Sequence, residues 1–165
     1  MASTIGTAPR RPAHALVRRG VRLILEAEPG LTVVAEAADG AEAVDLGRTV
    51  EVDLAVLDVS MPRMTGLQAA RALSRRKPGL AILMLSMHDN EQYFFESLNA
   101  GASGYVLKSA ADHDLVEACR TAVRGESFLY AGVTRTLVRD YLERVRAVNG
   151  CPGRCSPRAR RRWSS

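Results

Sequence analysis

Three polar side chains stand at the ends of three apolar runs in this sequence. Asp58 follows the run 54–57, Ser86 follows 82–85, and Lys108 follows 105–107. A carboxylate can attack a phosphoryl group as a nucleophile, a hydroxyl can hydrogen-bond to a phosphoryl oxygen, and an ammonium can neutralise its charge. If the three runs are neighbouring strands, the sequence predicts a site for an aspartyl phosphate.

Each of these residues also has a purely structural explanation. Asp58 could cap a helix or lie in a turn, Ser86 could be an ordinary strand end, and Lys108 could be a solvated charge. The coincidence of all three at successive strand ends favours a shared site.

The elements that must position these residues alternate between short apolar runs and amphipathic stretches. This pattern is typical of an α/β fold with a doubly wound parallel sheet, whose functional crevice lies at the carboxyl ends of the strands. The predicted strands are 31–37, 54–59, 81–86 and 105–107, and the predicted helices are 14–27, 40–49, 65–76, 90–99, 112–124 and 133–148.

Four segments resemble the receiver domain of bacterial two-component response regulators, over residues 14–146. The subgroup they resemble most is the NarL/LuxR-like one. The segments are 57–62 with Gly66, 85–88, 101–108 and, for the subgroup, 33–40.

The resemblance implies a CheY-like (βα)5 fold and assigns roles to single residues. Asp58 would be the phosphoacceptor, and Ser86 and Lys108 would contact the phosphoryl group. Tyr105 would be the aromatic switch that swings inward in the phosphorylated state. Without the resemblance, Tyr105 could equally be a half-buried ring on an edge strand.

The resemblance also implies partners and a setting. The partners are a sensor histidine kinase and a second copy of the receiver. The protein would regulate transcription in the cytoplasm and would not be an enzyme. A second interpretation is a pseudo-receiver that binds partners through its first and fifth helices without phosphorylation. A third is a hydrolase with Asp58 as nucleophile, but Ser60 stands where such enzymes usually carry a second carboxylate.

The N-terminal segment 1–13 departs from the family pattern. Family receivers have an apolar first strand ending in two acidic residues that hold Mg²⁺ with the phosphoacceptor, whereas Pro12 and Ala13 stand at that place here. Asp58 and the backbone carbonyl of Ser60 alone would make a weak Mg²⁺ site. We therefore expect impaired phosphorylation.

The same departure predicts a degenerate first strand. Two prolines and two arginines cannot supply a central strand's hydrogen bonds. Losing about four buried aliphatic side chains would cost ~6–12 kcal/mol. Since domains have only ~5–15 kcal/mol of net stability, a marginally stable or partly molten domain is expected, without a cooperative thermal transition above ~50 °C.

The C-terminal end departs as well. We expect a receiver over 14–126, a connector helix over 127–148 and a basic, disordered tail over 149–165 in place of a helix-turn-helix domain. The tail could contact nucleic acid non-specifically through its arginines and Trp163, but no specific DNA binding is expected. A displaced reading frame at both ends would explain both departures, and the codons of the gene would test it.

Charge and composition further limit the class of protein that this sequence can encode. Of the 23 basic residues, ten lie in 1–22 and 149–165, which hold none of the 18 acidic residues. The region between is therefore acidic, so the net charge of +5 does not indicate a nucleic-acid-binding face. The Arg-rich start loosely matches a transit peptide. No membrane segment is predicted, and the three cysteines fit reduced cytosolic thiols.

Overall fold

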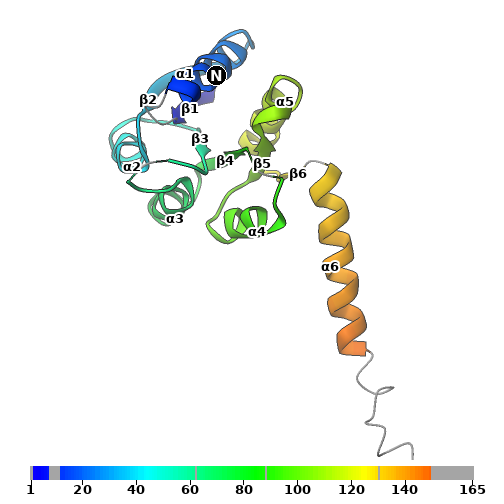
Figure 1. Ribbon diagram of the computed structural model, residues 1–165. Coiled ribbons are helices and arrows are strands. Elements are labelled where there is room, and N and C mark those ends of the chain that lie inside the picture. The colour runs from blue at the N-terminus through cyan, green and yellow to red at the C-terminus, as the bar shows by residue number, and fades with distance from the viewer. Residues whose placement is uncertain (1, 8–11, 62, 88, 130, 150–165) are drawn as a thin grey trace, which may run out of the picture. The chain divides into compact units, whose positions relative to one another are not determined.

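The computed structural model describes residues 2–7, 12–61, 63–87, 89–129 and 131–149. It divides the chain into two units, residues 1–130 and 131–165. The first unit is a parallel six-stranded sheet with α1 and α5 on one face and α2, α3 and α4 on the other (Figure 1). The predicted α/β fold class is confirmed.

The sheet has the strand order β2-β1-β3-β4-β5-β6. Consecutive strands are joined by helices because parallel neighbours require a crossover connection. The strands are β1 (Ala2–Thr7), β2 (Leu31–Ala37), β3 (Leu54–Asp58), β4 (Ala81–Ser86), β5 (Gly104–Leu107) and β6 (Phe128–Leu129).

The helices follow the predicted ranges to within two residues at each end. Capping side chains begin several of them: Asp39 Oδ1 accepts the Glu42 amide at the start of α2, and Thr65 with Gln68 forms a capping box at α3. The bounds are α1 (Pro12–Glu26), α2 (Gly40–Thr49), α3 (Gly66–Arg76), α4 (Glu91–Asn99), a 3-10 turn (Lys108–Ala110), α5 (Ala111–Val123) and, in the second unit, α6 (Ala131–Asn149).

The prediction that this segment could not supply the hydrogen bonds of a central strand is wrong. Residues 2–7 form β1, which pairs with β2 at six positions and with β3 at three. A ladder needs backbone donors and acceptors, and Ser, Thr and Gly supply these as well as aliphatic residues do. Pro12 lies beyond the strand, at the first position of α1, where a missing N–H costs nothing. The composition of β1 is nevertheless degenerate, with Ile5 as its one large aliphatic residue.

Two further details were not predicted. The β1–β2 register shifts between Thr4 and Ile5, which leaves Val34 as the extra residue of a bulge. Strand β6 pairs with β5 in a region expected to be helical, and a Cβ at Gly104 would meet Phe128 at 3.2 Å.

Residues 150–165, which include nearly all of the predicted basic tail, lie outside the described residues.

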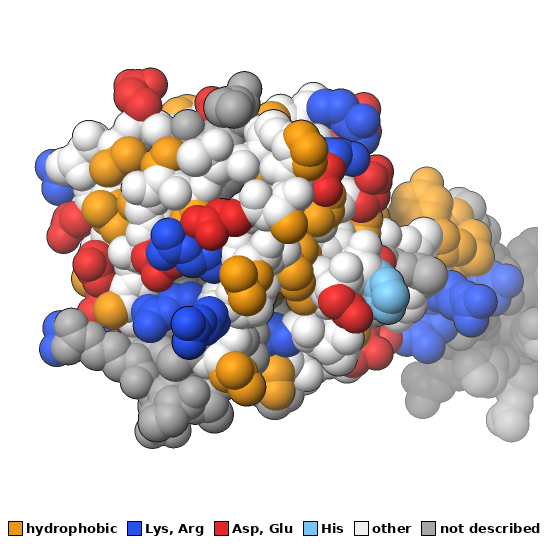
Figure 2. Space-filling view, turned by 90° about the horizontal axis from the view of Figure 1, so that it is seen from above, with side chains coloured by type: hydrophobic (Ala, Val, Ile, Leu, Met, Phe, Trp, Pro, Cys, Tyr) orange, Lys and Arg blue, Asp and Glu red, His pale blue; other side chains and the backbone are white. Residues whose placement is uncertain are grey.

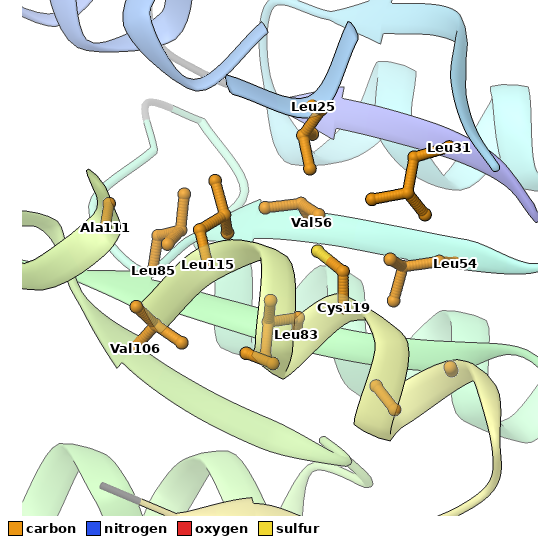
Figure 3. Close-up of a cluster of buried hydrophobic side chains, with 13 residues drawn as sticks. Leu25, Leu31, Leu54, Val56, Leu83, Leu85, Val106, Ala111, Leu115 and Cys119 are labelled. Atoms are coloured by element: carbon orange, nitrogen blue, oxygen red, sulfur yellow. The ribbon is translucent and has the colours of Figure 1, made fainter. Parts of the chain in front are cut away.

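The main core lies between the sheet and the helices α1 and α5 (Figure 3). Alternate residues of the central strands, such as Leu54, Val56 and Leu83, point towards Leu25 of α1 and Leu115 of α5. This packing holds the carboxyl ends of β3, β4 and β5 in place. Among the described residues, no helix is long and apolar enough to cross a membrane.

Candidate functional site

The sheet register brings the three predicted strand-end residues to one edge. Asp58 pairs with Leu85 across β3 and β4, and Ser86 pairs with Leu107 across β4 and β5. Lys108 follows directly after Leu107. The three residues therefore lie at the carboxyl ends of three adjacent parallel strands.

Asp58 and Lys108 form a buried ion pair that bridges the end of β4. Lys108 Nζ contacts Asp58 Oδ2, and both side chains are only 3% exposed. The backbone N–H of Ser60 donates to the other oxygen, Oδ1, at 2.9 Å. Both carboxylate oxygens thus have a partner in the described part of the chain.

This geometry rules out two of the structural explanations. Lys108 is not a solvated charge because its side chain is buried. Asp58 is not a helix cap, because the N-cap of α3 is Thr65. Ser60 contributes its amide to the carboxylate, a role that sequence reasoning missed although the residue stands two positions after Asp58.

The loop after β3 packs tightly against the strand end. Gly66 lies so close that a Cβ there would come within 2.1 Å of the Asp58 carbonyl oxygen. Its N–H donates to the Val59 carbonyl at 3.2 Å, and the Val59 N–H donates to the Leu85 carbonyl at 2.9 Å. Only glycine allows this close approach, which holds the Asp58 backbone in position.

Ser86 and Tyr105 form a second pair beside α4, at the ends of β4 and β5. The Tyr105 side chain is fully buried, its ring packs edge-to-face on Phe94 with centroids 5.8 Å apart, and its hydroxyl is hydrogen-bonded to Ser86. Burial raises the pKa of Tyr105, and the bond to Ser86 acts in the opposite direction. The ring lies inward, so the alternative of a half-buried edge-strand ring is wrong.

Comparisons with known proteins identify the family of this chain. Residues 13–120 match the family described as the response regulator receiver domain. The chain belongs to this family. The transcriptional regulatory protein DegU of Brevibacillus brevis is 39% identical over 128 residues, which are 78% of this chain and 54% of DegU. This receiver therefore spans about half the length of that relative.

Solved structures match it closely as well. A two-component response regulator of the LuxR family from Aurantimonas sp. SI85-9A1 has a TM-score of 0.78 at 31% identity, over 86% of this chain and 99% of that one. The isolated receiver of RcsB from Salmonella enterica serovar Typhimurium, solved in the presence of the phosphomimetic BeF3⁻, has a TM-score of 0.71 at 26% identity, over 81% and 96% of the two chains. The predicted CheY-like, NarL/LuxR-like receiver is confirmed.

The β1 side of the receiver pocket offers little to a metal ion. Asp39 Oδ1 accepts the hydrogen bond that caps α2, and Arg63 lies 3.7 Å from Asp39 Oδ2. Asp89 acts electrostatically on Tyr105. In the described ranges, no group of three His, Cys, Asp or Glu side chains could hold a metal ion. Since Mg²⁺ prefers several oxygen ligands, the residues of this pocket do not fit it.

Proposed function

We propose that this receiver accepts a phosphoryl group on Asp58 from a sensor histidine kinase and so takes part in regulating transcription. The observation that carries the proposal is the buried Asp58 carboxylate, with Lys108 on one oxygen and the Ser60 amide on the other. DegU, a relative, is by its name a transcriptional regulatory protein.

The proposed step is a simple phosphoryl transfer. An Asp58 oxygen forms the new O–P bond, the P–N bond of the kinase phosphohistidine breaks, and its electron pair returns to the ring nitrogen. The Lys108 ammonium neutralises the transferred phosphoryl oxygens, since it already lies on the carboxylate. The Ser86 hydroxyl, now bonded to Tyr105, is the donor for a further phosphoryl oxygen.

Phosphorylation by acetyl phosphate, read as an intact-mass shift, tests this function. We expect the mass of one phosphoryl group on the wild type and none on Asp58→Asn. An equal shift in both proteins would place the label elsewhere, and no shift in a protein that is folded by circular dichroism would remove Asp58 as acceptor.

A pseudo-receiver that acts by binding alone is the second candidate. It is favoured by the fact that residues 1–22 hold no acidic side chain to complete a metal site beside Asp58. It predicts a folded protein that binds its partner equally well with and without acetyl phosphate.

A homodimer through α1 and α5 is proposed for either function. Leu16 and Leu23 of α1 and Val123 of α5 are 75%, 62% and 40% exposed. On this face acidic and basic side chains are interleaved (Figure 2), as in the pairs of Arg22 with Glu26 and Glu36 at 2.9 and 2.7 Å. Light scattering of wild type and Leu23→Glu tests this dimer, which the variant should weaken.

A further inference from the structure

The Asp58 carboxylate already has a buried cation. Lys108 Nζ contacts Oδ2, and the Lys108 side chain is 3% exposed. The Ser60 N–H faces Oδ1, so this amide offers a positive dipole where a metal ion would need an electron pair. Each oxygen keeps a second lone pair, so a divalent cation there would have to share Asp58 with one of these donors and take its remaining ligands from other residues.

The neighbouring strand cannot supply a second carboxylate. β1 lies between β2 and β3 and is parallel to both, so it ends at the same edge of the sheet as Asp58. No residue from 1 to 22 is acidic. This conclusion holds for any placement of those side chains, because it depends only on their chemical type.

The remaining acidic residues near this edge are committed to other contacts. Asp39 caps α2 with one oxygen and has Arg63 near the other. Asp89 follows β4, and its charge contributes to the raised pKa of Tyr105. One carboxylate with an ammonium on it is a poor ligand set for Mg²⁺, which binds through carboxylates and phosphate oxygens and gives up its water reluctantly.

We infer that in this receiver Lys108 takes the place of the divalent cation: the Asp58 pocket does not bind Mg²⁺, and phosphoryl acceptance there does not depend on it. The second half of the inference rests on the proposed function, and the first half does not.

Metal binding can be tested without any phosphorylation. Mn²⁺, a paramagnetic stand-in for Mg²⁺, broadens the amide resonances of residues close to it. We expect no selective broadening at Asp58, Val59 and Ser60 of the wild type, and no shift of these resonances with millimolar Mg²⁺. Broadening that is lost in Asp58→Asn would overturn the inference.

A matched variant tests the cause. Pro12→Asp/Ala13→Asp carries two carboxylates at the sequence positions where the family motif has them, and we expect it to gain broadening at Asp58. A folded variant that gains none would contradict the missing carboxylates as the reason. Lys108→Arg keeps the cationic charge and should stay as insensitive to Mn²⁺ as the wild type.

Acetyl phosphate labelling in Mg²⁺ or in EDTA tests the second half. Equal labelling supports the inference, and labelling only in Mg²⁺ overturns it. No labelling in either buffer, together with no Mn²⁺ broadening, would remove the proposed phosphoacceptor while confirming that the pocket has no metal site.

Discussion

The two sides of β3 differ sharply in what they bring to the carboxyl edge of the sheet. On the β4–β5 side, Asp58, Ser86 and Lys108 are buried or nearly so and contact one another or a neighbouring ring. On the β1 side, the strand is paired on both edges but is followed by no acidic residue before α1. The comparison teaches that a receiver pocket has two separable halves, one that handles the phosphoryl group and one that holds the metal ion.

The largest expected effect comes from the β4–β5 half. Lys108→Met leaves a buried carboxylate without its cation, so the free energy of unfolding should fall by about 3–5 kcal/mol in urea titrations. The double variant Asp58→Asn/Lys108→Met should recover much of this loss.

Lys77, the other lysine of the chain, offers a matched control. Its Nζ donates to the Val50 carbonyl at 3.3 Å, and among the described residues it forms no ion pair. Lys77→Met should cost about 1 kcal/mol. Equal losses at positions 77 and 108 would mean that the Asp58–Lys108 pair is not buried in solution.

The next effect tests whether β1 is truly inserted in the sheet. Thr4 pairs with Val33 on one side and Leu54 on the other, so Thr4→Pro should cost about 3 kcal/mol or more of unfolding free energy. Ala2 begins the strand and pairs only with Leu31, so Ala2→Pro should cost much less. If the two variants unfold at the same urea concentration, the β1 side is not ordered as described.

Gly66→Ala should have a somewhat smaller effect. The added Cβ would lie 2.1 Å from the Asp58 carbonyl oxygen, and relief of that clash should cost about 1–3 kcal/mol and reduce labelling of Asp58. Gly79→Ala is the control, because a Cβ there meets nothing within 4 Å. A Gly66→Ala protein as stable as Gly79→Ala would show that the loop does not constrain Asp58.

The last effect is absent at neutral pH and concerns the core beneath both halves, where Cys119 packs near Leu31 and Leu54 (Figure 3). Burial raises the pKa of Cys119 from 9.0 to about 12. The unfolded chain therefore releases this proton first, and stability should fall as pH rises from 9 towards 12, by about 1.4 kcal/mol per pH unit.

Comparison with Cys119→Ala, in a background of Cys151→Ser and Cys155→Ser, isolates this thiol from Tyr105, whose pKa is also raised. The variant should show the shallower decline of stability with pH. The same slope in both proteins would mean that water reaches Cys119 through a loosely packed β1 side.

The sequence predicted most elements because their signals are local. Apolar runs mark β3 and β4, and polar caps such as Asp39 and Thr65 begin the helices they precede. The hydrogen-bond ladder of β1 was not predicted, because serine, threonine and glycine carry no apolar alternation and the prolines and arginines of 9–12 follow directly in the sequence. Only the pairing with β2 and β3 reveals this strand. Strand β6 was missed because two residues are too few to show a period.

The features of the site also separate into those that the sequence predicts and those that only the structure shows. By itself the sequence determined that Asp58, Ser86 and Lys108 end three buried runs, because the residues of a buried strand are apolar and can be recognised from their type alone. Only the tertiary structure decided that Lys108 contacts Asp58 across β4, that Tyr105 is bonded to Ser86, and that residues 2–7 fill the gap between β2 and β3. These contacts depend on strand order and register between segments far apart in the chain, which are set by satisfying backbone hydrogen bonds and filling the core together.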